Sequence, residues 1–184
     1  MSSNKKLPQR KSIRLKGYDY SQSGLYFTTI CTQNRGNILG EIDNGEMVLN
    51  EFGQIAYDEW SVLPKRFCIM EPDVFVIMPN HIHGIIKIVG ASLAGPRNVG
   101  ACLNRAPARG APTISIGELI GAYKSLVSNR CLDIYKSKNI KMGRLWQRNY
   151  YEHVIRKEKE YDEIAKYILN NPMNWSKDKY YSER

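Results

Sequence analysis

The sequence has no hydrophobic run long enough to cross a membrane, and residues near its start lack the apolar core of a secretion signal. We therefore expect a cytoplasmic protein with no membrane partner, associated with the nucleoid if it binds DNA. The four cysteines form no CxxC pair and have no histidine at zinc-ligand spacing, which argues against a structural zinc site. Histidine is scarce, with three residues.

Acidic residues are also few, since 18 of them oppose 27 basic residues in a chain of 184. The formal net charge of +9 makes a polyanion the expected class of partner. The length and the 42% hydrophobic content predict one globular domain over residues 1–184. Residues 1–18 form a basic arm without an acid, and residues 90–112, with 13 Gly, Ala or Pro among 23 positions, are expected to be a flexible insertion.

The order of the expected elements favours an α+β fold, with helices packed on a ferredoxin-like antiparallel sheet. Turn and capping signals delimit these elements, and we place the two strands beside Pro79-Asn80 in the middle of the fold. The expected order is a strand from residue 24, a hairpin at Asn44-Gly45, a helix capped by Asn50, two strands around Pro79-Asn80, a helix with a Ser115 and Glu118 capping box, a strand within 144–155, and a helix over 157–171.

Two of the three histidines form the motif Asn80-His81-Ile82-His83. On a strand, residues two apart share a face, so both imidazoles point to one side and Ile82 to the other. A random HxH pair is more often two polar residues at a strand start. Two rings held rigidly by apolar strands can, however, supply half of a metal site.

The final helix offers a nucleophile and a third ligand. A helical wheel with about 100° per residue places Tyr167 off the apolar stripe, on a face with Glu163, and Asn171 lies one turn beyond it. By itself this wheel also fits an ordinary exposed tyrosine. Together with the histidines, the Asn171 amide oxygen could complete a metal site beside the phenol. The stripe itself consists of Tyr161, Ile164, Ala165, Ile168 and Leu169.

The chain resembles the single-tyrosine HUH transposases of the insertion sequence 200 type, and more narrowly the REP-associated tyrosine transposases. Four segments carry the resemblance: KSIRLKGYDYSQSGLYFTTICTQNR, VFVIMPNHIHGI, LWQRNYYEHVIR and YILNNP. It implies a ferredoxin-like HUH fold and a divalent metal, Mg²⁺ or Mn²⁺, at His81 and His83. It also implies Tyr167 as the nucleophile toward single-stranded DNA and Asn171 as the additional ligand. The insertion at 90–112 departs from the compact family core.

The resemblance predicts a transposase that nicks and rejoins single-stranded DNA near palindromic-repeat hairpins through a covalent 5′-phosphotyrosine intermediate. Because metal binding needs neutral imidazoles, activity should fall as the pH drops through roughly 6.5. Monomer and homodimer both remain open. We expect His153 to support the site or contact DNA. DNA-binding candidates are the basic and aromatic residues Lys11, Arg14, Lys16, Arg144, Trp146, Arg148 and Tyr150, with a core role for the aromatics as the alternative.

Two other functions stay open. One is a noncatalytic domesticated module that binds DNA or RNA hairpins, for which Tyr167 would have no role. The other is a metal-dependent nuclease that uses water, which normally needs several acidic ligands. The wheel supplies one carboxylate, Glu163, on the face that carries Tyr167, so this reading is the weaker.

Overall fold

The computed structural model describes residues 22–67, 69–89 and 114–181. The predicted basic arm at 1–18 and the predicted insertion at 90–112 lie outside the described residues. In the described part, no helix combines the length and the apolar character that crossing a membrane requires.

A four-stranded antiparallel sheet forms the centre of the fold, with the strand order β4-β5-β1-β6. If the small hairpin is set aside, the chain order is β1, α1, β4, β5, α2, β6, which together with this strand order is the ferredoxin-like arrangement. The predicted α+β fold is confirmed, although β4 lies at the sheet edge and not in its middle. The strands are β1 (Gly24–Cys31), β4 (Met70–Met78), β5 (His81–Ile88) and β6 (Tyr151–Ile155), and the hairpin is β2 (Gly40–Asp43) with β3 (Glu46–Leu49).

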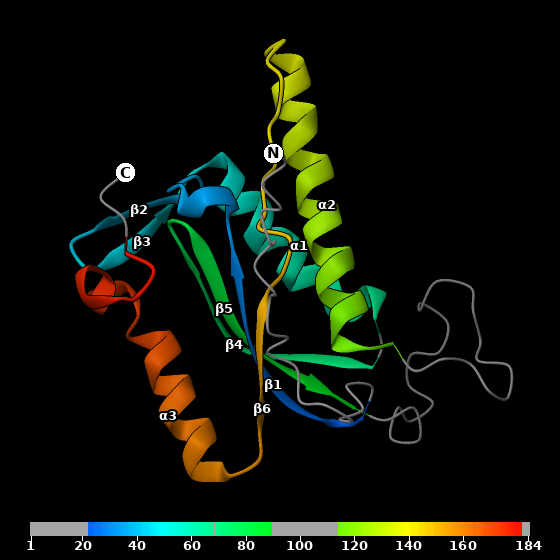
Figure 1. Ribbon diagram of the computed structural model, residues 1–184, viewed down its shortest axis with the longest axis vertical. Coiled ribbons are helices and arrows are strands. Elements are labelled where there is room, and N and C mark those ends of the chain that lie inside the picture. Colours follow the sequence, from blue (N-terminus) through cyan, green and yellow to red (C-terminus); the bar gives the residue numbers. More distant parts are fainter. Residues whose placement is uncertain (1–21, 68, 90–113, 182–184) are drawn as a thin grey trace, which may run out of the picture.

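Helices cover both faces of the sheet (Figure 1). Helices α1 (Glu51–Arg66) and α2 (Ile116–Ser137) pack on one face and enclose the larger core, while α3 (Glu158–Leu169) packs on the other. The short 3₁₀ helices are η1 (Gln33–Arg35) and η2 (Pro172–Lys177). The apolar stripe of α3 contacts the sheet as predicted except for Leu169, which ends the helix and is 65% exposed.

The predicted turn and capping residues hold their expected places. The Asn50 side chain accepts hydrogen bonds from the first amides of α1, and Ser115 and Glu118 form the capping box of α2. Asn44 and Gly45 both have positive φ, as a tight hairpin turn requires. Local sequence signals therefore fix where these elements begin.

Gly84 lies on β5 against the fully buried ring of Trp60. A Cβ at this position would lie 2.5 Å from Trp60 Cζ2 and 2.8 Å from Cη2, and both atoms belong to a rigid ring. We expect Gly84→Ala to lower the free energy of unfolding by about 1–3 kcal/mol, the usual cost of overpacking a core. Urea denaturation measures this loss. Gly121→Ala on α2 is the control, since its Cβ meets nothing within 4 Å; equal stability of the two variants would contradict the packing seen here.

Candidate metal and tyrosine site

The histidine pair lies on the face of the sheet that α3 covers. His81 and His83 are fully buried on this face. Ile82 is also buried, but on the opposite face, in the core beneath α1 and α2. Phe27, on the neighbouring strand β1, lies with its ring centroid 5.3 Å from that of His83. The predicted division of β5 into a histidine face and an isoleucine face is confirmed.

Hydrogen bonds around Asn80 set the tautomer of His81. The Asn80 amide nitrogen donates to the carbonyl oxygens of Arg35 and Tyr180, at 3.2 and 2.9 Å, so its oxygen is left to accept from His81 Nδ1 at 2.8 Å. With the proton on Nδ1, His81 Nε2 carries a free lone pair. That atom is buried and has no hydrogen-bond partner among the described residues. It has the form of a metal ligand.

His83 joins the sheet to the last helix. Its Nδ1 lies 2.8 Å from Thr29 Oγ1 on β1, and its Nε2 lies 3.0 Å from the hydroxyl oxygen of Tyr167 on α3. The two histidine ring centroids are 4.4 Å apart. Strand β5 and helix α3 therefore bring together side chains that the sequence separates by 84 positions.

Tyr167 stands where the helical wheel placed it, away from the apolar stripe, with its side chain 39% exposed. Its hydroxyl donates to Asp178 Oδ2 at 2.9 Å. One side of the phenol faces a shallow surface hollow, and the other faces the histidines. The hollow is lined by Glu163, Lys166, Tyr167, Asn170, Asn171, Asn174, Lys177 and Asp178. Tyr167 is therefore open to solvent on the side of this hollow.

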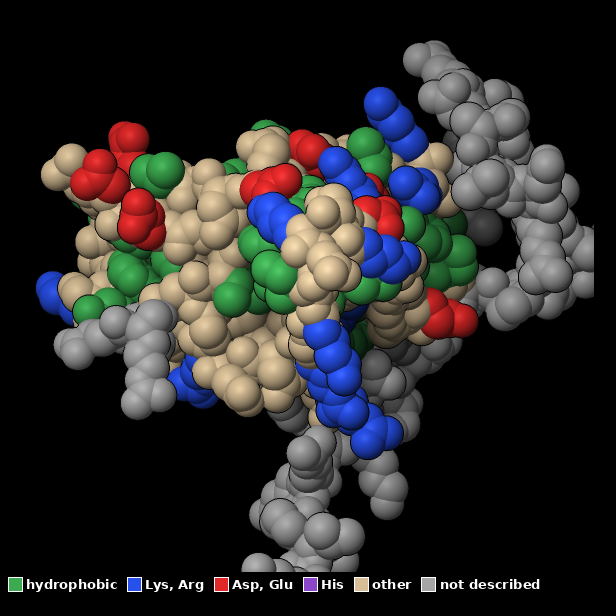
Figure 2. Space-filling view, turned by 90° about the horizontal axis from the view of Figure 1, so that it is seen from above, with side chains coloured by type: hydrophobic (Ala, Val, Ile, Leu, Met, Phe, Trp, Pro, Cys, Tyr) green, Lys and Arg blue, Asp and Glu red, His purple; other side chains and the backbone are tan. Residues whose placement is uncertain are grey.

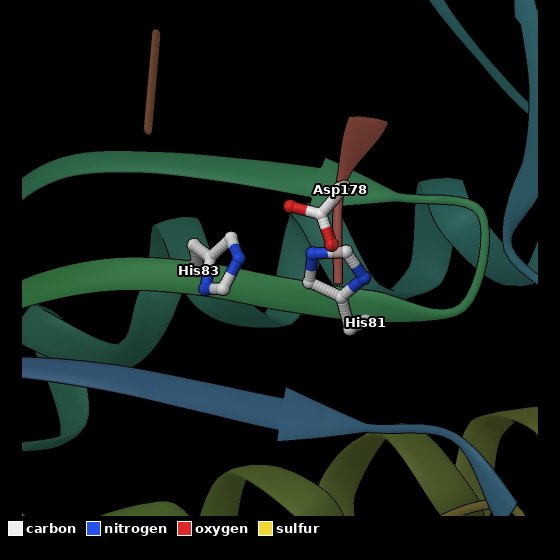
Figure 3. A group of neighbouring side chains, drawn as sticks. All are labelled: His81, His83 and Asp178. Atoms are coloured by element: carbon white, nitrogen blue, oxygen red, sulfur yellow. The ribbon is translucent and has the colours of Figure 1, made fainter. Parts of the chain in front are cut away.

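Asp178 completes the cluster, and the sequence analysis missed it. It follows η2, and its Oδ2 accepts a hydrogen bond from Asn171 Nδ2 at 2.8 Å. Ligand atoms of His81, His83 and Asp178 all lie within 4.8 Å of one another, and Figure 3 shows the carboxylate beside the two rings. Asn171 is nearly fully buried, and its Oδ1 has no hydrogen-bond partner in the described part of the chain.

These residues fit a divalent cation. Imidazole nitrogens, a carboxylate and an amide oxygen suit Mn²⁺, and the oxygens also suit Mg²⁺. Within residues 22–67, 69–89 and 114–181, two buried potential ligand atoms, His81 Nε2 and Asn171 Oδ1, lack a hydrogen-bond partner, and such groups are costly unless something satisfies them. A cation held by His81, His83 and Asp178 would satisfy His81 Nε2, and Asn171 Oδ1 would join it once the amide is turned, because Asn171 Nδ2 is the atom that faces Asp178. The acidic residue of this cluster is thus Asp178, from the segment after η2, and not Glu163 of α3.

Burial shifts the ionisation of every member of the cluster. Desolvation lowers the pKa of His81 to about 4, against the opposing pull of the Asp178 carboxylate. Desolvation and the neighbouring His81 lower the pKa of His83, whereas desolvation and the hydrogen bond to Asp178 raise the pKa of Tyr167. Burial raises the pKa of Asp178, but hydrogen bonds from Tyr180, Asn171 and Tyr167 outweigh it and the net shift is downward. The lowered pKa keeps His81 neutral well below pH 6.5, so the expected fall in activity would set in at a lower pH if protonation of His81 causes it.

The buried histidines predict how stability depends on pH in metal-free protein. The unfolded chain protonates histidine near pH 6.5, but folded His81 resists protonation until about pH 4. Between these values the unfolded state binds more protons, so the free energy of unfolding should be greatest above pH 6.5 and fall as the pH drops toward 4. Urea denaturation at several pH values in chelator measures this decline. His81→Asn should make it shallower, and a flat profile from pH 7 to 5 would contradict the buried neutral pair.

The structure divides the predicted DNA-binding residues. Trp146 is a core residue, 7% exposed, with its Nε1 donating to the Lys124 carbonyl oxygen at 3.1 Å, so we withdraw its stacking role. Tyr150 is partly buried and packs against the same core. Arg144 and Arg148 are exposed. Lys11, Arg14 and Lys16 lie outside the described residues.

Two further observations concern charge. His153 Nε2 lies 2.7 Å from Glu160 Oε1, and Glu160 also accepts a hydrogen bond from the Arg156 amide, so His153 braces the turn between β6 and α3. In the face shown in Figure 2, Lys and Arg side chains extend from the upper right to the lower middle, with Asp and Glu side chains among them in the upper part and a further acidic group at the upper left. The basic excess of the sequence is therefore unevenly distributed on this surface.

No family model matches the sequence. A protein of Haemophilus influenzae (strain ATCC 51907 / DSM 11121 / KW20 / Rd), described as uncharacterized, is 40% identical over 180 residues, which are 97% of this chain and 96% of that protein. Among solved structures, a REP-associated tyrosine transposase bound to a REP hairpin superimposes with a TM-score of 0.57. That match has 17% sequence identity and covers 88% of this chain and 74% of the other, and it establishes likeness of fold.

Proposed function

The chain belongs to the same family as the uncharacterized Haemophilus influenzae protein, and we propose that it is a metal-dependent tyrosine transposase that nicks and rejoins single-stranded DNA. One observation carries the proposal. The Tyr167 hydroxyl lies against His83 and Asp178, in a cluster with two buried potential ligand atoms that have no hydrogen-bond partner among the residues that the structure describes. The likeness of fold to a REP-associated tyrosine transposase supports it.

The proposal gives each residue a task. The pKa of Tyr167 lies above its ordinary value, so the phenol is protonated at neutral pH and must lose its proton as it attacks. Asp178 Oδ2 accepts the hydrogen bond from this hydroxyl, with 2.9 Å between the two oxygens, so it orients the hydroxyl and can take up the proton. His81, His83, Asn171 and Asp178 would hold the divalent cation, Mg²⁺ or Mn²⁺, which when bound polarises the scissile phosphate.

The reaction conserves the phosphodiester. Attack forms a bond from the Tyr167 oxygen to phosphorus and breaks the bond to the 3′ oxygen, which leaves a 5′-phosphotyrosine and a free 3′-hydroxyl. A 3′-hydroxyl of another strand can then displace Tyr167 and rejoin the DNA without ATP. Tyr167 suits both steps because its side chain is 39% exposed beside an open hollow, so an incoming strand can reach the ester.

The proposed substrate is single-stranded DNA beside an imperfect hairpin. The solved transposase of similar fold is bound to a REP hairpin, and we extend that partner to this chain. The exposed Arg144 and Arg148 are the described candidates for contacts with phosphate, and the basic residues Lys11, Arg14 and Lys16 would add to them.

A denaturing gel tests the function. The protein is mixed with end-labelled hairpin DNA carrying single-stranded flanks from its own gene, in Mg²⁺, Mn²⁺ or chelator. We expect a protease-sensitive protein–DNA adduct in either metal and none in chelator. DNA labelled on the 3′ side of the cut should shift with the protein, while DNA labelled on the 5′ side should be released.

The alternatives give different products in the same experiment. A nuclease that uses water would yield nicked DNA with no protein attached. A noncatalytic hairpin-binding module would retard the DNA on a native gel and leave it intact on the denaturing gel. Either product would overturn the tyrosine mechanism.

A further inference from the structure

The segment that delivers Asp178 also fixes the next residue, Lys179, beside the site. The Tyr180 amide donates to Asp178 Oδ1 at 2.6 Å, and the Tyr180 carbonyl accepts from the Asn80 side chain at 2.9 Å. Arg35 donates from its guanidinium to the Lys179 carbonyl at 3.3 Å. Asn80 also bonds His81 Nδ1, so one amide positions both the histidine and the segment around Lys179.

Two positive charges surround the Tyr180 ring. Lys179 Nζ lies 4.8 Å from its centroid and 5.5 Å from that of Tyr151, and Arg35 Cζ lies 5.3 Å from the Tyr180 centroid. The Tyr180 ring centroid is in turn 4.7 Å from that of His81. The charge of Lys179 contributes to the lowered pKa of both histidines, which shows that the ammonium lies within electrostatic reach of the cluster.

Neither cation is neutralised in the described part of the chain. Lys179 and Arg35 are exposed, and neither forms an ion pair with a carboxylate of the described residues. Contact with aromatic rings orients the Lys179 ammonium and the Arg35 guanidinium and leaves their charges unneutralised. Because these side chains are already ordered, binding an anion would cost them less conformational entropy. Two oriented and unpaired cations beside a nucleophile have the character of an anion site.

We propose that Lys179 and Arg35 bind a backbone phosphate of single-stranded DNA at the edge of the Tyr167 site. The inference rests on the proposed function and adds a phosphate contact by residues other than Arg144 and Arg148. The guanidinium can present two N–H groups to the phosphate oxygens, and the ammonium supplies a compact charge. The contact places the chain of phosphates so that the scissile one meets Tyr167.

Binding tests the site without any need for cleavage. In a Tyr167→Phe background, Lys179→Met and Arg35→Met are compared by titration of labelled hairpin DNA with single-stranded flanks over a series of NaCl concentrations. Each loss of a phosphate contact should weaken binding about 5- to 10-fold at low salt and reduce the slope of log K against log salt by about 0.7. Lys136→Met, at the exposed end of α2 and paired with Asp133, should change neither.

Modified DNA identifies the contact. A single neutral methylphosphonate is moved through the flank, and at one position it should weaken binding to the Tyr167→Phe protein, weaken it less when Lys179→Met is added, and cause no further loss when both Lys179→Met and Arg35→Met are present. In the chain that retains Tyr167, Lys179→Met should slow adduct formation about 10- to 100-fold, whereas Lys179→Arg should keep most of the rate.

The two hypotheses fail separately. Absence of any adduct with wild-type protein overturns the tyrosine mechanism, while the salt slopes and the methylphosphonate series still report on the phosphate site. Unchanged affinity and slope in Lys179→Met and Arg35→Met, in variants whose unfolding temperature matches that of the wild type, overturn the phosphate site whatever the adduct result.

Discussion

Replacing Tyr167 with phenylalanine should abolish the covalent protein–DNA adduct, with a loss of about 10⁴-fold or more in the rate of its formation. The variant keeps the ring, whose centroid lies 5.1 Å from that of His83 and 6.3 Å from that of Phe27. It removes the single oxygen that hydrogen-bonds to Asp178 and lies beside His83. No other atom at that position can become the ester oxygen.

A matched tyrosine on the same helix is available as the control. Tyr161 donates to Asp73 at 3.0 Å and packs against the sheet, away from the metal cluster. Tyr161→Phe should therefore form the adduct at close to the wild-type rate. Tyr167→Phe should still bind hairpin DNA and unfold at nearly the wild-type temperature, because the lost hydroxyl is partly exposed. An adduct of normal yield with Tyr167→Phe would remove this residue as the nucleophile.

Replacing His81 with alanine should weaken Mn²⁺ binding by about 100-fold or more, because it deletes a ligand whose lone pair has no other use in the described structure. Isothermal titration calorimetry of chelator-treated protein gives the affinity directly. Asn171→Ala should cause a smaller loss of about 10-fold, since a neutral amide oxygen binds a divalent cation less strongly than an imidazole does.

The third histidine supplies the control for this experiment. His153 pairs with Glu160 at the turn before α3 and does not contact the cluster, so His153→Ala should bind Mn²⁺ as the wild type does. Because His81→Ala leaves a cavity at a buried position, the variant could lose stability. Circular dichroism is therefore needed to show that it is folded before its affinity is compared. Equal affinity in folded His81→Ala and wild type would mean that the metal binds elsewhere.

The sequence could predict those parts of the site that lie on regular elements. The two-residue repeat of a strand places His81 and His83 on one face, and the wheel of α3 places Tyr167 off the buried stripe. Asp178 could not be predicted in this way, because Pro172 ends the helical register and η2 redirects the chain before it. The hydrogen bond from Asn171 to Asp178 holds the chain in this new direction, and no local sequence pattern predicts that bond.

The error at Trp146 has a different cause. The alternation of arginines and aromatics in RLWQRNYY is typical of a surface that binds nucleic acid. It also fits an irregular segment that buries one aromatic ring in the core and exposes its arginines. Trp146 bridges to Thr32 and lies in the core beside Tyr123 of α2. Which reading holds depends on contacts with β1 and α2, and these are remote in the sequence. The pKa of His81 departs from that of a free histidine for a related reason, since burial of this side chain is a tertiary property.

The place of β1 in the sheet has a consequence for synthesis of the protein. Strand β1 is the earliest of the described strands to leave the ribosome, yet one of its two partners is β6, with Tyr26 opposite Val154. At about 5–20 residues per second, several seconds pass before that partner exists, and Tyr167 and Asp178 follow later still. A nascent chain consequently lacks Tyr167, Asp178 and one edge of its sheet until residue 178 has been added. Under the proposed function, a chain that has not yet reached Asp178 would be unable to cut DNA.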